Sequence, residues 1–478
     1  MELGLRDVQG NVVPGFHKDH QAFLFVRFGE VAGARQWLAS QQPELASAYE
    51  VNLFRQLFQS LRQRREESGP DAPTAADPTS PAAQDAGALQ AISATWLNVG
   101  LSASGLGRLL GPAAVARFGG PFDTNRVPGV PPSEINAADA LLIVAADEAL
   151  KLEVELGRQR QRLAACAVDE LICLRGDALP GPQRGHEHLG FKDGVSQPRL
   201  QLADDTWTGR GPAVAPGEFV LGLPDAVGRP SGAGLPAWVQ NGSFLAFVQI
   251  EQHVGTFWAA MQQHAPRLGT SAETLAAQIV GRTRTGDPVG GGPSQPPATF
   301  SHVGRAYARQ LGGQAAQHRI LRRGLPYGPP WQPGDTDDGS RGLLFVAYQA
   351  DLGRQFEHVW DTWLNSPTFP APGAGRDGLV GQAPAPGTHG PLTSTSLLTP
   401  WTPTADRPAA VATTATVGQG GQKGGLIALR LPVFVTPRRG AYFFAPSLSG
   451  LAFLSQTQAL TPATQTRTQV ASWRTNAP

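Results

Sequence analysis

The fold is decided by a short apolar stretch near the start of the chain, Gln21-Ala22-Phe23-Leu24-Phe25-Val26-Arg27-Phe28. Aromatic and aliphatic residues dominate it, which is typical of a β-strand. The segment that follows, residues 31–41, has helical apolar periodicity and contains one tryptophan. Residues 242–250 and 254–263 repeat this strand and this helix in the same order, again with one tryptophan in the helix. The chain therefore looks duplicated.

The repetition continues further along both halves. A strand predicted at residues 140–145 and a helix at 148–163 have counterparts in a strand at 342–347 and a helix at 353–364. The remaining predicted elements are strands at 94–99, 170–174 and 442–446 and helices at 51–62 and 102–110. Short strands mixed with helices, in two similar sets, predict an α+β fold whose helices pack against antiparallel sheet. The alternative is that such echoes arise by chance in any chain that mixes helices and strands.

Three segments interrupt this pattern. Residues 63–91, 285–298 and 370–425 are rich in small, polar, Gly and Pro residues, and we interpret them as loose insertions. We place the boundary between the two halves at residue 215, so that residues 1–215 form one half and 216–478 the other.

Composition sets limits on the class of protein. The 478 residues are 41% hydrophobic and 16% charged, which is typical of a globular protein, and the net charge of +1 favours neither nucleic acid nor an anionic membrane as partner. The two cysteines, Cys166 and Cys173, match no disulfide framework and no zinc spacing. The N-terminal residues lack a leader pattern and no apolar run is long enough to span a bilayer, so we expect a cytoplasmic protein.

The candidate chemistry lies in one glycine-punctuated stretch, His186-Glu187-His188-Leu189-Gly190-Phe191-Lys192-Asp193-Gly194-Val195-Ser196-Gln197-Pro198. Gly190 and Gly194 permit positive φ and close backbone approach, so the stretch is predicted to form an irregular loop. Such a loop can hold Asp193 against a flat ligand. The simpler alternative is a surface Asx turn around Asp193 and Gly194.

Gly-Phe-Lys-Asp-Gly, followed by Val-Ser-Gln-Pro, resembles the G-x-x-D-G signature of the dye-decolourising (DyP-type) haem peroxidases. Several other stretches resemble that family in the same order, namely residues 7–12, 218–222, 241–244, 279–282 and 341–365. The resemblance implies two ferredoxin-like halves, with the Asp193 loop carried by the N-terminal half. It also implies that Asp193 lies on the distal face of a haem, and that Gly190 and Gly194 lie close to the cofactor.

The same resemblance implies that the C-terminal half holds the haem and supplies its iron ligand. Residues 301–309 are similar to the proximal stretch of the family, which makes His302 the predicted ligand and Arg309 a predicted haem contact. After His302 this chain departs from the usual pattern at Gly304, Tyr307 and Ala308. His318 and His358 are the alternative ligands. Glu357 is predicted to accept a hydrogen bond from the Nδ1–H of the proximal histidine, or else to be an exposed helix carboxylate.

Residues 317–329 are similar to the family's distal arginine stretch, and the register from the proline assigns Arg322 as the catalytic arginine beside Asp193. The neighbouring Arg323 is the alternative. A fixed guanidinium suits this role because cleavage of the peroxide O–O bond develops negative charge on the leaving oxygen. Asp193 is expected to carry a proton from one peroxide oxygen to the other.

The implied function is that of a haem peroxidase containing haem b (iron protoporphyrin IX). It would reduce hydrogen peroxide and oxidise bulky dye-like or phenolic donors by one-electron steps, with Tyr327 and Tyr307 as the tyrosines nearest the motifs that could relay electrons. One alternative is a haem-binding or haem-delivery protein with little turnover, for which a distal acid–base pair has no use. Another is a partner-binding protein without haem. Oligomeric state is left open by the sequence.

Overall fold

The computed structural model describes residues 4–67, 94–200, 213–289, 301–370, 374–381, 394–398 and 427–456. Most of the three predicted insertions therefore falls outside the described residues. Within the described part of the chain, no helix is both long enough and apolar enough to cross a membrane.

The first half is built on four antiparallel strands in the order β4-β1-β3-β2. Along the chain they run as β1 (His20–Phe28), β2 (Thr95–Leu101), β3 (Ala140–Ala146) and β4 (Val168–Asp177). Helix α1 (Val31–Gln41) connects β1 to the following elements, and α7 (Ala149–Ala165) connects β3 to β4. This strand–helix–strand, strand–helix–strand order is the ferredoxin-like arrangement.

The second half repeats that arrangement in the strand order β13-β7-β10-β8, with β9 beside β10. Its strands are β7 (Ser243–Gln252), β8 (Leu321–Arg322), β9 (Leu325–Tyr327), β10 (Gly342–Gln349) and β13 (Val435–Ala445). Its helices are α8 (Val254–His264), α9 (Ala272–Val280), α10 (His302–Tyr307), the 3-10 segment η7 (Arg309–His318) and the π-helical η8 (Leu352–Leu364). The predicted duplicated α+β fold is confirmed.

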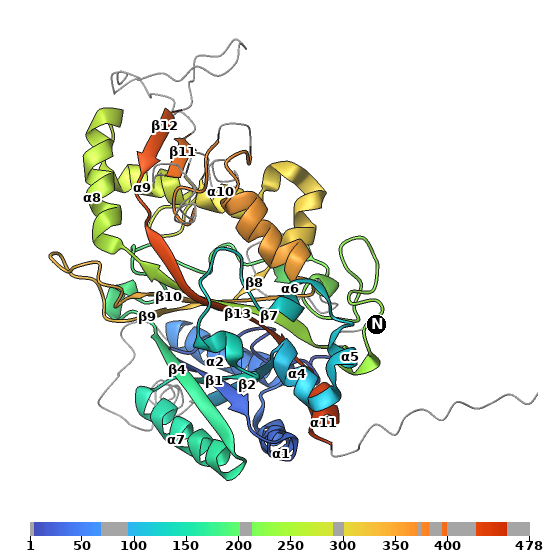
Figure 1. Cartoon of the computed structure of the whole chain (residues 1–478). Helices are drawn as coiled ribbons and strands as arrows, with labels where there is room; N and C mark the ends of the chain where they lie inside the picture. The colour runs from blue at the N-terminus through green and yellow to red at the C-terminus, as the bar shows by residue number, and fades with distance from the viewer. Residues whose placement is uncertain are drawn as a thin grey trace, which may run out of the picture.

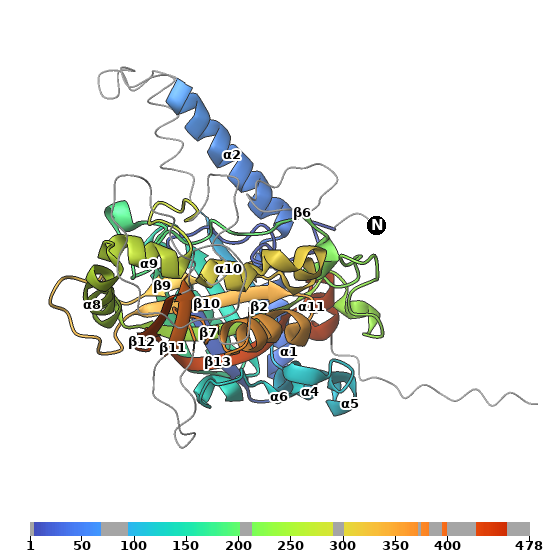
Figure 2. The ribbon, with the colours of Figure 1, turned by 90° about the horizontal axis from the view of Figure 1, so that it is seen from above.

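The remaining elements are shorter or peripheral. Besides six short 3-10 helices in the described residues, they include helices α4 (Ala103–Leu110), α5 (Pro112–Val115), α6 (Gly120–Thr124) and α11 (Leu448–Ser455), and strand pairs β5 (Arg199–Leu200) with β6 (Ala213–Val214) and β11 (Ser394–Leu398) with β12 (Ile427–Leu431). Helix α2 (Ala48–Glu67) is longer than the predicted helix at residues 51–62, and Figure 2 shows it projecting from the body of the molecule. The predicted insertion at residue 63 therefore begins within a helix.

The two halves share one sheet instead of forming two separate ones. Strand β2 of the first half meets β13 of the second at a single paired position, Leu101 with Phe444. The resulting sheet has nine strands, and Figure 1 shows α1 and α7 at the end of the molecule away from α8 and α9. The sheet curls, so that a Cβ added at Gly176 of β4 would lie 2.9 Å from the carbonyl oxygen of Pro326 in β9.

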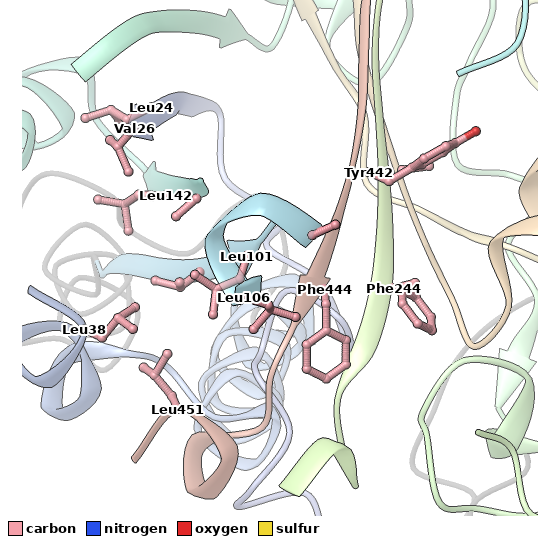
Figure 3. Close-up of a cluster of buried hydrophobic side chains, with 14 of the residues drawn as sticks. Leu24, Val26, Leu38, Leu101, Leu106, Leu142, Phe244, Tyr442, Phe444 and Leu451 are labelled. Carbon is pink, nitrogen blue, oxygen red and sulfur yellow. The ribbon is translucent and has the colours of Figure 1, made fainter. Parts of the chain in front are cut away.

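Each face of the sheet buries its own apolar cluster, because successive side chains of a strand point to opposite faces. Leu24 and Val26 of β1 pack with Leu142 and with Leu38 of α1, as Figure 3 shows. The alternate residues of the same strand face the other half of the molecule: the rings of Phe23 and Phe25 lie 5.6 and 5.0 Å from the ring of Phe247 in β7. These aromatic contacts hold the two halves together.

Candidate active site

One cavity lies between the sheet of the second half and the helices that cover it, and residues 187–196 of the first half form part of its wall. Its walls are largely apolar: the lining includes Ile250 of β7, Leu343 and Phe345 of β10, and Phe356, Val359 and Trp360 of η8. Most polar side chains that line it come from the loop around Asp193, from α10 and from the segment that contains β8, and Gln252 of β7 and Arg282 after α9 complete them. An apolar cavity with a few converging polar groups is the usual form of a cofactor site.

The loop that carries Asp193 is held by its own hydrogen bonds. The carboxylate of Glu187 accepts the backbone N–H groups of Leu189 at 2.8 Å and Phe191 at 2.9 Å. The N–H of Asp193 donates to the carbonyl of Gly185 at 3.0 Å, and Asp193 Oδ1 accepts the N–H of Gly194 at 2.6 Å. Asp193 lines the cavity, with its side chain 42% exposed.

The two glycines of this loop have different surroundings. Both have positive φ, 95° at Gly190 and 75° at Gly194, as the irregular loop requires. Only Gly194 lines the cavity. A Cβ added at Gly190 would instead meet the guanidinium of Arg284 at 2.8 Å. In this structure Gly190 therefore makes room for an arginine side chain, and its contact with a flat ligand stays a prediction.

Arg322 lies in β8, and its guanidinium faces the same cavity as Asp193. Its Nη2 is 3.9 Å from Asp193 Oδ1. The backbone of Arg322 is fixed on both sides, by pairing with Ala347 of β10 and by the side-chain amide of Gln197, which donates to its carbonyl and accepts its N–H. Arg322 and Asp193, distant in the sequence, thus form one ion pair at the cavity.

Arg323 points away from this pair because adjacent strand residues alternate in direction. Its guanidinium donates to the carbonyls of Asn11 at 3.1 Å and Val12 at 2.9 Å, and it is buried. Burial lowers the pKa of Arg323 to about 10. Arg322 is therefore the member of the arginine pair that reaches the cavity.

His302 is the first residue of α10 and also lines the cavity. The helix starts there because the Ser301 hydroxyl accepts the N–H of Gly304 at 3.1 Å. The Nδ1 atom of His302 is 3.2 Å from Oδ1 of Asp377, a fully buried carboxylate that also accepts the N–H groups of Leu379 and Val380. Burial alone would raise the pKa of Asp377, but the adjacent His302 and the backbone N–H donors lower it overall.

An ionised Asp377 has only acceptor oxygens, so His302 must present its Nδ1–H to it. In a neutral ring Nε2 is then the nitrogen with the lone pair, and it is the atom left to coordinate a metal.

Glu357 does not have the predicted role. Its Oε1 accepts the hydroxyl of Tyr442 at 2.8 Å, and burial raises its pKa. Figure 3 shows the Tyr442 hydroxyl directed away from the aliphatic cluster. The partner of the His302 imidazole is Asp377, and Glu357 is not among the residues that line the cavity.

The alternative histidines form a pair of their own. The rings of His318 and His358 stack with centroids 3.9 Å apart. His318 lines the cavity and its Nδ1 lies 2.5 Å from the carbonyl oxygen of Arg354, while burial lowers its pKa. Of the histidines on the cavity wall, His302 is the one with a carboxylate partner in the described residues.

Comparison with known proteins shows which family this chain resembles. A profile of the family described as Dyp-type peroxidase, C-terminal, matches residues 186–368. Peroxidase 2 of Mycetinis scorodonius is 26% identical over 94% of this chain and 87% of that protein. A multifunctional dye peroxidase from an Amycolatopsis species is 27% identical over 94% of this chain and 96% of that protein. The solved structure of an ancestral D-type dye decolorizing peroxidase covers 95% of this chain and 99% of its own, with a TM-score of 0.69 and 23% identity.

The chain is similar to the DyP-type peroxidase family: the family profile matches residues 186–368, and relatives named dye-decolorizing peroxidases align with 94% of the chain. The resemblance carried by the Gly-Phe-Lys-Asp-Gly motif is thereby confirmed. A further DyP-type structure, with a TM-score of 0.66 and 23% identity, is a dye-decolorizing peroxidase in complex with 2,6-dimethoxyphenol.

Two residues of the site were not predicted from the sequence: Asp377, which lies behind His302, and Arg319, which lines the cavity. Asp377 lies in the Gly/Pro-rich segment that was interpreted as an insertion, where a single aspartate has no distinguishing context. Arg319 lines the cavity and lies over the ring of Tyr307 at 4.3 Å, while its Nη1 donates to the Tyr307 carbonyl at 2.6 Å. The predicted haem contact Arg309 begins η7, but its side chain lies outside the described part of the chain.

Proposed function

We propose that this protein is a haem-dependent peroxidase, which reduces hydrogen peroxide and oxidises bulky dye-like or phenolic donors by one-electron steps. The observation that carries the proposal is the Asp193–Arg322 pair, 3.9 Å apart, on the same cavity as an imidazole whose Nδ1 is held by a buried carboxylate. A haem carrier would need the imidazole but has no use for the distal pair.

The cavity suits haem in three respects. Its apolar walls match the apolar faces of a porphyrin. The Nε2 atom of His302 is the atom left for the iron, since Nδ1 is engaged by Asp377. Lys192, Arg282 and Arg319 are cations on the lining that could meet propionates.

Haem b is the form we propose, because a covalent link through cysteine has no support in the described residues. Neither Cys166 nor Cys173, both described and both free thiols, lines the cavity. The free thiols also suit a reducing compartment, and a cytoplasmic location remains part of the proposal.

Bound haem would supply the iron that passes electrons to peroxide. The organic donors would then return electrons to the haem and be oxidised. Asp193, hydrogen-bonded to the loop backbone and still partly exposed, would take a proton from one peroxide oxygen and return it to the other. Arg322, held by Gln197 and β10, would meet the negative charge that develops on the leaving oxygen. The ion pair between the two side chains would keep the carboxylate oriented between turnovers.

The donor class rests on the relatives. Several curated relatives are named dye-decolorizing peroxidases, and one solved relative holds a dimethoxylated phenol. We propose that this chain accepts donors of the same chemical kind, namely electron-rich aromatic compounds.

The proposal is tested with haem-loaded protein mixed rapidly with hydrogen peroxide. The parent protein should show a Soret band that changes on mixing. Asp193→Asn should slow that change by a factor of roughly 10²–10⁴, and Arg322→Leu by about 10²–10³ or more. We expect the arginine variant to be slowed at least as much as the aspartate variant, because water can replace a proton shuttle more readily than a fixed cation. Both variants should keep the Soret band. Parental rates in both would overturn the peroxidase assignment in favour of the haem carrier.

A further inference from the structure

Glu187 is a carboxylate on the cavity wall to which the proposed chemistry gives no role. It lies six residues before Asp193 in the same loop and lines the cavity with it. Its side chain nevertheless makes more hydrogen bonds than that of Asp193. Oε1 accepts the N–H of Phe191, and Oε2 accepts both the N–H of Leu189 and the side-chain amide of Gln252.

The first two bonds close the loop on itself. Leu189 and Phe191 follow Glu187 at the second and fourth positions, so their N–H groups converge on one carboxylate. The backbone supports the same turn, since the N–H of Glu187 donates to the carbonyl of Phe191 at 3.1 Å and that of Gly190 to the carbonyl of Glu187 at 2.9 Å. The turn ends just before Asp193.

The third bond attaches this turn to the sheet. Gln252 is the last residue of β7, and its Nε2 lies 2.6 Å from Glu187 Oε2. The backbone N–H of Gln252 donates to the carbonyl of Arg341 at 3.1 Å, which ties it to the chain entering β10. Among the residues that the structure describes, no other side chain joins the Asp193 turn to β7.

The Gln252 amide can serve both protonation states of Glu187. Its Oε1 atom is buried and accepts no hydrogen bond from the described residues. If Glu187 is protonated, rotation of the amide by half a turn would bring this oxygen to the carboxyl O–H, because an amide offers a donor on one side and an acceptor on the other. The link therefore survives a change in the charge of Glu187.

We propose that Glu187 is a positioning residue, which holds the Asp193 loop to the end of β7 through Gln252 and so keeps Asp193 beside Arg322. The effect on catalysis rests on the proposed peroxidase function, whereas the effect on the loop does not. A carboxylate that only closes a surface turn would need no partner on β7, and its loss would not act through Asp193.

The loop is tested first without haem, by hydrogen exchange of the Leu189 and Phe191 amides. Glu187→Gln places an NH₂ group where an acceptor is needed, so exchange of these amides should rise about tenfold, as for the loss of one hydrogen bond to a charged group. Gln252→Leu should raise it as well, although it leaves the turn's own bonds intact. Glu153→Gln is the matched control, since Glu153 pairs with Arg175 at the surface of the first half. Unchanged exchange in Gln252→Leu would overturn the link to β7.

The link to Asp193 is tested in haem-loaded protein by the rate of reaction with hydrogen peroxide. Glu187→Gln should lower this rate about tenfold in the parent and leave it unchanged in an Asp193→Asn background, with the same Soret band and the same KM for the donor. An equal loss in both backgrounds would overturn the proposal, because Glu187 would then act independently of Asp193. If the parent itself failed to react with peroxide, the proposed peroxidase function would be wrong. The hydrogen-exchange result would still show whether Glu187 holds the Asp193 loop to β7.

Discussion

At the scale of single residues, the most informative contact is the one between His302 and Asp377. The carboxylate is fully buried and the imidazole is 25% exposed, so one side of the ring is anchored in the protein while the other faces the cavity. Carboxylates behind a metal-binding histidine fix the tautomer and increase the basicity of the ring. Here the contact with His302 explains why Asp377 remains charged although it is buried.

We predict that His302→Ala loses stoichiometric haem binding while the protein stays folded, since no other described histidine on the cavity has a carboxylate partner. Asp377→Asn should weaken haem binding by about 10–100-fold, because the ring loses its charged acceptor. Haem titration followed by the Soret band measures both, with circular dichroism as the check on folding. His318→Ala is the control and should bind haem normally. Full haem occupancy in His302→Ala would transfer the ligand role to His318.

Glu187 leads to a prediction about pH. Enclosure in the cavity wall raises its pKa from 4.5 to about 7, against the effect of its three hydrogen-bond donors. Below pH 4.5 the carboxyl is protonated in the folded and the unfolded chain alike, and between 4.5 and 7 only the folded chain keeps the proton. Proton binding by Glu187 therefore stabilises the folded chain at low pH, and this contribution to the free energy of unfolding is lost as the pH rises through 7.

The measurement is the free energy of unfolding of the haem-free protein from pH 4 to pH 8. As the pH rises over this range, the free energy of unfolding of the parent should fall by roughly 1–3 kcal/mol relative to that of Glu187→Gln. A constant difference between parent and variant would show that Glu187 does not titrate there.

At the scale of elements, helix α10 matters because it begins on the candidate ligand. Its six residues cannot form a stable helix alone, so the cap at Ser301 and the packing against η8 decide where His302 sits. Helix α11 provides a matched comparison, because Ser447 caps it in the same way, by accepting the N–H of Gly450 at 3.0 Å.

We predict that Ser301→Ala and Ser447→Ala each cost about 1 kcal/mol of stability. Only Ser301→Ala should also weaken haem binding several-fold, since it lets the first turn of α10 fray and displaces the imidazole. Chemical unfolding and haem titration of the two variants give the comparison. Equal haem affinity in the two variants would mean that Asp377 alone holds the ring.

At the scale of the whole molecule, the contact between the halves is made by aromatic rings from β1 and β7. Phe247 is fully buried and touches both Phe23 and Phe25 of the other half. Because the halves also share one sheet, neither has a complete core of its own. The division at residue 215 stays a prediction. Because the two parts share buried core residues, we expect them to fold together.

We predict that Phe247→Ala lowers the free energy of unfolding by about 3–5 kcal/mol, the usual cost of emptying an aromatic site in a core. Unfolding should remain a single transition, whether it is followed by tryptophan fluorescence or by circular dichroism. Two separated transitions would contradict this, because they would show halves that are stable alone.

The linear pattern of residues predicted most of the longer strands and helices of both halves, although not α9, α10, β8 or β9, and motifs shared with a known family singled out His302, Asp193 and Arg322. Those features depend on short-range periodicity and on compact motifs, which are complete within a few consecutive residues. The partners of these residues depend instead on how distant segments pack. Asp377 reaches His302 from 75 positions away, and Gln252 reaches Glu187 from 65 positions away. Glu357 was assigned to the wrong partner for the same reason: it lies in the expected helix, but packing turns it toward Tyr442. Side-chain partners across such separations are chosen by burial and by the need to satisfy buried polar atoms, and these conditions exist only once the chain has folded.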